Sequence, residues 1–196
     1  MIDSNSLGNP DQFRSLAELE AGLAALPAAP KDSGRVVLLL RKGDGGLRET
    51  PDRIQASVEN GFPGDAWGRQ ADRTPVAQLA VMQRDVAELM ANSQPLTLFG
   101  DNLILELDLS AVNLPIGSRV RAGSVVFEVT PMPHDGCKKF RARFGDDALR
   151  FVSKPALRHR NLRGIYLRVI EDGEVRVNDS VEVISRAPSV QAMPPT

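Results

Sequence analysis

The stretch from Pro131 to Arg163 combines the only cysteine of the chain, Cys137, with an excess of positive charge. Nine lysines and arginines stand here against three aspartates, so the stretch carries +6 in a chain whose net charge is -1. The thiolate is the nucleophilic and metal-ligating form of cysteine, and neighbouring cations favour it. We therefore expect a reactive Cys137 that takes up sulfur or ligates a soft metal. The alternative is that Cys137 is a small buried hydrophobic residue.

The arginines of the same stretch are candidates for binding an anionic group. Guanidinium donors match the oxygens of a phosphate in pairs, which favours arginine at such sites. In an extended chain alternate residues share a face, so Arg141 and Arg143 would point the same way. The alternative is a solvated cationic face. The candidate set is Arg141, Arg143, Arg158, Arg160 and Arg163.

Both histidines of the chain, His134 and His159, also lie in this stretch. Histidine titrates near neutral pH, so each is a candidate proton shuttle near the thiol. His134 precedes Cys137 by three residues and is the second candidate catalytic residue. The two histidines lack the paired spacing of a zinc site, which is therefore not expected. The alternative for each is an ordinary surface or hydrogen-bonded histidine.

Three further candidates for the binding site lie upstream. Asp65 and Trp67 belong to a Gly- and Pro-rich stretch without periodicity, which runs from Leu47 to Thr74. Long irregular segments in compact domains are often functional or mobile. The pair would line a pocket mouth, or else form a turn and an aromatic plug. Asn102 would hydrogen-bond a ligand, or else occupy a turn, since Asn tolerates left-handed backbone geometry.

Short strands with turn signals between them are expected to position these residues. The predicted strands are Arg35–Arg41, Leu103–Leu109, Gly117–Gly123, Ser124–Thr130, Gly164–Glu171, Val175–Val177 and Val181–Ser185. This spacing indicates a β-sandwich or β-barrel. Apolar residues at helical spacing predict a helix over Asp11–Leu26, for packing or a homodimer contact. Val76–Ala91 is either one helix, or a strand to Met82 followed by a short helix from Gln83.

Length and composition limit the class of protein. A chain of 196 residues suggests one main domain. Aromatic residues make up only 5% and the net charge is near zero, which argues against nucleic acid as a partner. A single cysteine excludes an internal disulfide. No signal peptide is evident and no apolar run is long enough to span a bilayer, so we expect a cytoplasmic protein without a membrane partner.

In the order of its motifs the chain resembles the molybdenum cofactor sulfurase C-terminal (MOSC) domain family. The resemblance covers roughly residues 33–185. It rests on GlyAspAlaTrp (64–67), PheGlyAspAsnLeu (99–103), ProIleGlySerArgVal (115–120), PheGluValThr (127–130), Cys137, ArgPheGly (143–145), ArgGlyIleTyrLeuArgVal (163–169) and GluValArgValAsnAspSerValGluVal (174–183). His134 stands where the family more often has arginine, and Gly136 where it more often has proline.

The resemblance implies a mainly β fold, a MOSC-like β-barrel with a few short helices. The expected organisation is an N-terminal helical extension at 1–32, the barrel at 33–185 and a flexible tail at 186–196. The resemblance also implies molybdenum cofactor (molybdopterin) binding with Cys137 as the metal or sulfur contact, and brings the family's association with pyridoxal phosphate. Sulfur transfer and reduction of N-hydroxylated compounds are both open, with a redox or sulfur-donor protein as partner. The rival hypothesis is a non-catalytic ligand-binding or interaction module.

Overall fold

A closed barrel of seven strands forms the centre of the molecule. The computed structural model describes residues 2–3 and 7–188; residues 1, 4–6 and 189–196, and with them most of the predicted tail, lie outside this description. The barrel order is β10-β6-β7-β2-β12-β8-β9, and only the β6–β7 pair is parallel. The barrel strands are β2 (Ser33–Leu39), β6 (Leu79–Gln83), β7 (Leu103–Leu105), β8 (Arg119–Ala122), β9 (Val125–Val129), β10 (Ile165–Glu171) and β12 (Ser180–Ser185). The predicted mainly β fold is confirmed.

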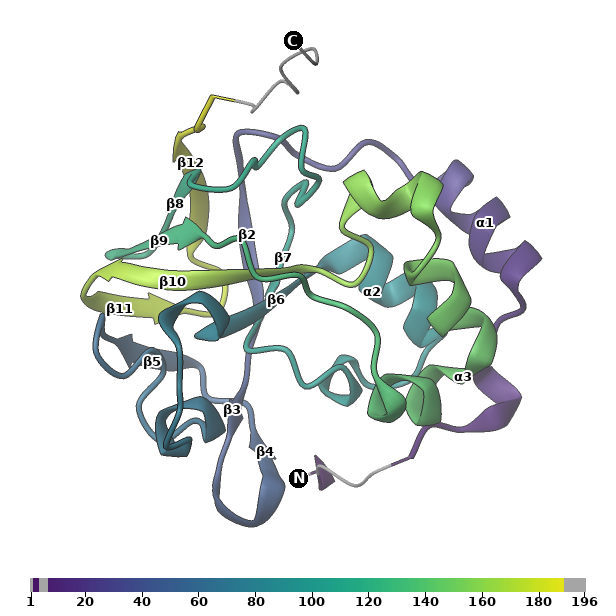
Figure 1. Ribbon diagram of the computed structural model, residues 1–196, viewed down its shortest axis with the longest axis horizontal. Helices are drawn as coiled ribbons and strands as arrows, with labels where there is room; N and C mark the ends of the chain where they lie inside the picture. The colour runs from purple at the N-terminus through teal and green to yellow at the C-terminus, as the bar shows by residue number, and fades with distance from the viewer. Residues whose placement is uncertain (1, 4–6, 189–196) are drawn as a thin grey trace, which may run out of the picture.

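Two small sheets and a helical layer complete the fold. Helices α1 (Leu16–Ala25), α2 (Arg84–Ala91) and α3 (Lys138–Val152) gather on one side of the barrel (Figure 1). One small sheet has the order β1-β4-β3, and the other pairs β11 with β5. Their bounds are β1 (Ile2–Asp3), β3 (Arg41–Lys42), β4 (Leu47–Glu49), β5 (Arg53–Ala56) and β11 (Gly173–Arg176). No helix in the described part of the chain is long and apolar enough to cross a membrane.

The molecule has two apolar cores that share β6 as a wall. Val81 faces the interior of the barrel, with Phe127 and Leu167 among its neighbours in that core. Met82, the next residue, belongs to the core between the barrel and the helices, which includes Phe140. Successive side chains of a strand point to opposite faces, so a strand covered on both faces is apolar throughout. This explains why periodicity left Val76–Ala91 ambiguous; its second alternative, a strand followed by a helix, is the one observed.

Predicted elements differ from the observed ones at several places; the strand predicted over Leu103–Leu109, for example, ends at Leu105. The first helix begins at Leu16, because Ser15 and Glu18 form a capping box that fixes its start. Residues 138–152 form α3, whereas the sequence predicted only a connection between strands. Consequently Arg141 and Arg143 do not share a face: Arg141 is exposed and Arg143 is buried. The extended-chain argument for a common face was therefore wrong.

Candidate functional site

Cys137 lies at the entrance to α3, where the loop from β9 meets the helix. It is the N-cap residue in an extended conformation, its side chain makes no capping hydrogen bond, and it is exposed. Its carbonyl oxygen accepts a hydrogen bond from the Arg141 amide at 3.0 Å. The thiol is therefore open to solvent at the positive end of the helix, where anions are stabilised.

A buried ion pair joins three distant parts of the chain near this loop. Nη1 of Arg163 donates to both carboxylate oxygens of Asp101, at 3.0 and 2.8 Å. Nε2 of His134 lies 3.4 Å from Oδ1 of the same aspartate. The Arg163 guanidinium also lies over the ring of Phe140, 5.2 Å from its centroid, and the His134 ring packs on Tyr166 with centroids 4.6 Å apart. Asp101 therefore holds together the segments that precede β7, β10 and α3.

Burial is the main cause of the pKa shifts of His134 and Asp101. It lowers the pKa of His134 well below its usual value, and the positive charges of Arg163 and Lys42 lower it further. Burial likewise raises the pKa of the Asp101 carboxyl, although Arg163, Lys42 and Arg143 act in the opposite direction. His134 is consequently a neutral imidazole at physiological pH, in a region where cations outnumber ionised acids.

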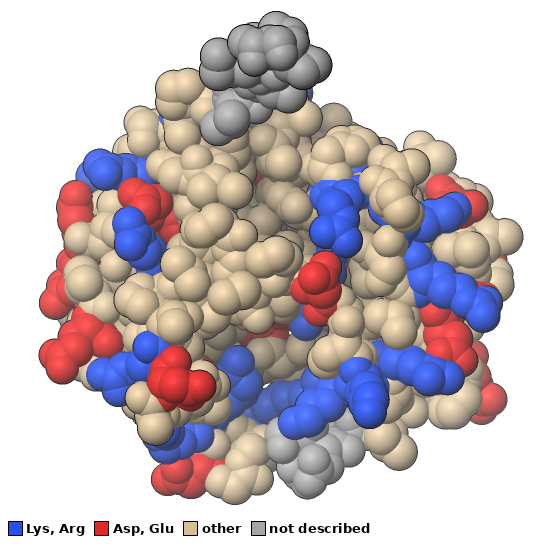
Figure 2. Space-filling view, in the orientation of Figure 1, with Lys and Arg blue, Asp and Glu red and all other residues tan. Residues whose placement is uncertain are grey.

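Two further arginines converge on Gly100, the residue before Asp101. A Cβ atom at Gly100 would lie 3.5 Å from Nη2 of Arg48 and 3.8 Å from Nη1 of Arg143. We call Lys42, Arg48, Arg143 and Arg163 the cationic cluster. Burial lowers the pKa of the Arg143 guanidinium, and the charge of Cys137 acts on it in the opposite direction. Figure 2 shows lysine and arginine side chains along the lower edge of a hollow between the barrel and the helices.

The predicted anion-binding arginines separate into two groups. Arg143 and Arg163 belong to the cationic cluster, together with the predicted His134. Arg141 is exposed and paired with Asp146, and Arg160 is exposed and lines cavities on the side of α1. Arg158 is exposed and lines a cavity of about 70 Å³, which His134 and Arg163 also line. The exposed His159 lines a cavity that includes none of the cluster.

Asp65 and Asn102 form a buried clip that fixes the wall of the site. Asn102 accepts a hydrogen bond from the Ala80 amide at 3.1 Å and donates to the Leu40 carbonyl at 3.2 Å and to Asp65 at 3.0 Å. Asp65 also accepts hydrogen bonds from the backbone amides of Lys42 at 2.7 Å and Trp67 at 3.0 Å. These contacts engage both side chains with the backbone, so the clip positions the chain around Lys42.

Trp67 is buried beneath the irregular segment that contains it. Its side chain is buried, its indole N–H donates to the Thr74 carbonyl at 3.0 Å, and Arg73 lies over its ring at 5.4 Å. The structure therefore places Trp67 under its own loop, in contact with Thr74 and Arg73.

Sequence reasoning missed four residues of the site: Lys42, Arg48, Asp101 and Tyr166. Asp101 stood within the PheGlyAspAsnLeu segment, but only its neighbour Asn102 was selected. Tyr166 stood within a predicted strand, and its position beside the ion pair follows only from the pairing of β10. Lys42 and Arg48 carried no sequence signal, because they flank an ordinary Gly-rich turn.

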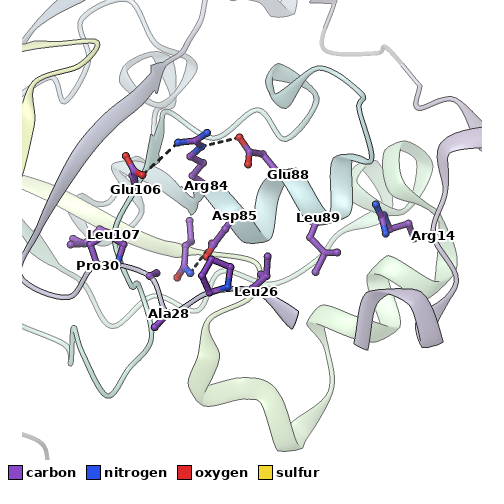
Figure 3. A pocket seen from close by; sticks show the side chains of 13 residues that line it. Arg14, Leu26, Ala28, Pro30, Arg84, Asp85, Glu88, Leu89, Glu106 and Leu107 are labelled. Atoms are coloured by element: carbon purple, nitrogen blue, oxygen red, sulfur yellow. Dashed lines mark hydrogen bonds and ion pairs between the residues drawn. The ribbon is translucent and has the colours of Figure 1, made fainter. Parts of the chain in front are cut away.

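A larger cavity lies elsewhere in the described structure. A groove of about 630 Å³ runs between the linker that follows α1 and helix α2 (Figure 3). Leu26, Leu89 and Leu107 line its apolar part, and Arg84 bridges Glu88 and Glu106 at its rim. None of its lining residues belongs to the cationic cluster or contacts Asp101.

The neutral state of His134 predicts how stability changes with pH. Below pH about 6.5 the unfolded chain protonates this residue while the folded protein does not, so stability falls with decreasing pH, by at most about 1.4 kcal/mol per pH unit. The raised pKa of Asp101 contributes with the opposite sign, because the folded protein then binds more protons than the unfolded chain.

We expect His134→Gln to remove the fall in stability between pH 6.5 and 5, measured by urea unfolding at several pH values. The matched variant is His159→Gln, which replaces the only other histidine of the chain at an exposed position, so that the comparison assigns the effect to the buried residue. An unchanged slope in His134→Gln would contradict the assignment of a buried neutral imidazole.

Comparison with known families agrees with this fold. A family model described as the MOSC domain matches residues 62–182, more than half of the chain. The chain therefore belongs to the MOSC domain family. No curated protein matches the sequence.

Solved structures support the fold assignment. A protein described as hypothetical is 21% identical with a TM-score of 0.59, over 80% of this chain and 70% of that one. The YUAD protein from Bacillus subtilis is 16% identical with a TM-score of 0.58, over 77% and 95%. YiiM from Escherichia coli is 22% identical with a TM-score of 0.53, over 78% and 71%.

Proposed function

We propose that the protein binds an anionic molybdenum–pterin cofactor, with Cys137 as the protein ligand of the metal and the cationic cluster as the site of the cofactor's phosphate. The observation that carries the proposal is the convergence of Arg48 and Arg143 on Gly100, near the exposed thiol. A Cβ atom at Gly100 would be in ordinary van der Waals contact with both guanidiniums, and two neighbouring guanidiniums match a phosphate well. When bound, the cofactor supplies two-electron redox chemistry at its metal.

The chain's own residues have distinct parts in this proposal. A thiolate is a soft ligand suited to molybdenum, and Cys137 presents its sulfur to solvent. Among the described residues no three His, Cys, Asp or Glu side chains come together as a metal site. The proposal therefore has the metal arrive with its other ligands from the pterin. Asp101 fixes the positions of Arg163 and His134, and burial disfavours a proton on the second nitrogen of His134.

Two residues on the same helix give a matched test of the phosphate site. We expect Arg143→Ala to lower the pterin content of protein from a cofactor-producing host, and to weaken phosphate binding roughly 10- to 100-fold. This corresponds to loss of a charged hydrogen bond of roughly 1.5–3 kcal/mol. Arg141→Ala, two residues away but exposed, should behave as wild type. Pterin is measured by fluorescence after oxidation, and phosphate by calorimetric titration. Equal losses in both variants would indicate a diffuse charge effect and count against the site.

Sulfur transfer is the second candidate, because an exposed thiol without a capping role is also accessible to a sulfur donor. It predicts a cyanide-labile sulfur on Cys137 after incubation with a cysteine desulfurase and cysteine. The rival non-catalytic module predicts neither cofactor nor labile sulfur. It also predicts that iodoacetamide alkylates Cys137 at pH 6–7 no faster than free cysteine.

A further inference from the structure

Helix α3 is broken in the middle, and its first half carries the site. Gly145 has φ 89° and ψ 172°, which interrupts the helix after Phe144. The segment Lys138–Phe144, with Cys137 at its start and Arg143 near its end, is therefore only about two turns long. Helices this short are marginal by themselves, so tertiary contacts must set the position of this segment.

Residues 8–16, from the N-terminal part of the chain, supply contacts on one side of the break. The amide of Gly8 donates to the Ala142 carbonyl at 3.2 Å. Gly8 lies so close to the carbonyl of Arg143 that a Cβ atom there would overlap it. The ring of Phe13 covers Gly145, since a Cβ at Gly145 would lie 2.8 Å from its Cδ2 atom.

Residues 8–16 also form hydrogen bonds with the end of α2 and with the second half of α3. The Asn9 amide donates to Oε1 of Gln94 at 2.7 Å, and Nη2 of Arg14 donates to Oδ1 of Asn92 at 3.0 Å. Beyond the break, the Leu16 amide donates to Oδ2 of Asp147 at 3.1 Å. Residues 8–16 thus link the end of α2 to both halves of α3.

Aromatic packing holds the opposite side of the half-helix. Phe144 stacks on Phe99 with ring centroids 4.2 Å apart, and Phe140 lies 6.2 Å from the same ring. Phe99 immediately precedes Gly100, where the guanidiniums of Arg48 and Arg143 meet. A shift of the half-helix would therefore move Arg143 relative to Gly100.

We infer that residues 8–16 are a positioning element of the anion site, with Phe13 and Gly8 as its positioning residues. They touch no ligand but set where Arg143 stands. The segment lies outside residues 62–182, the part that matches the family model. The identity of the ligand in this inference rests on the proposed function. The position of residues 138–144 does not depend on any ligand and can be measured separately.

The test uses Phe13→Ala and Gly8→Ala in the full chain, with inorganic phosphate as the probe. Loss of an outer-shell partner of a metal ligand typically costs about 10- to 100-fold in affinity, and we take the lower end for this anion site. We expect phosphate affinity to fall about tenfold in both variants, and amide hydrogen exchange of residues 138–144 to accelerate. Leu7→Ala, at the 72% exposed position directly before this segment, should match wild type in both measurements.

A second control separates positioning from general destabilisation. Val175→Ala removes buried methyl groups from the β11–β5 sheet, and should lower the melting temperature without changing phosphate affinity or exchange in residues 138–144. Phe13→Leu keeps an apolar side chain over Gly145 and should recover most of the affinity if Phe13→Ala folds poorly. Wild-type affinity and exchange in Phe13→Ala would overturn the inference. If instead Arg143→Ala binds phosphate as wild type does, the proposed function fails, while the exchange measurement still decides the positioning role.

Discussion

Protein purified as the Cys137→Ser variant from a host that makes the molybdenum–pterin cofactor is expected to contain no molybdenum above background. A serine hydroxyl is a hard, protonated ligand at neutral pH, whereas a thiolate suits a soft metal. Loss of a partner that merely supports a metal ligand already costs about 10- to 100-fold in metal affinity, so loss of the ligand itself should cost more. Metal is measured by mass spectrometry, and pterin by fluorescence in the same sample.

Bound pterin should fall together with molybdenum, because in this proposal the metal arrives on the pterin. The exposed position of Cys137 implies an unchanged melting temperature, so a loss of metal cannot be attributed to unfolding. Since Cys137 is the only cysteine, the variant also provides a thiol-free reference for alkylation. Wild-type molybdenum content in Cys137→Ser would rule out the thiol as the metal ligand.

Asp101→Ala should lower the free energy of unfolding by about 3–5 kcal/mol, the usual effect of leaving one partner of a buried ion pair uncompensated. Its carboxylate contacts Arg163 at 2.8 and 3.0 Å and His134 at 3.4 Å, and both it and Arg163 are buried. The measurement is urea unfolding, with the midpoint compared at unchanged m.

A surface pair on α3 provides the control. Asp146→Ala removes the partner of Arg141, and both of these side chains are more than half exposed, so the cost should stay below about 1 kcal/mol. The double variant Asp101→Ala/Arg163→Met should regain part of the lost stability, because it removes the uncompensated guanidinium. Similar losses of unfolding free energy for Asp101→Ala and Asp146→Ala would show that the Asp101–Arg163 pair contributes no more than a surface ion pair.

The strands could be predicted because their burial is periodic. In β10, Ile165, Leu167 and Val169 are buried while Tyr166 and Arg168 between them are only partly so. Helix α3 was not predicted, because the nine cations of residues 131–163 favoured the interpretation of this stretch as a charged connection between strands. Its apolar signal was nevertheless present: Phe140, Phe144 and Phe151 lie four and seven residues apart and pack into one core.

The sequence by itself determined the mainly β class, the place of the single thiol and the concentration of positive charge around it. These properties are local, since they follow from alternation, composition and residue type along short stretches. Only the tertiary structure decided which charges meet. Closure of the barrel brings Asp101 to Arg163, 62 residues further along the chain, and the helical turn of α3 buries Arg143 while exposing Arg141. The physical reason is that burial and ion pairing depend on strand register and helix packing, which one-dimensional spacing does not specify.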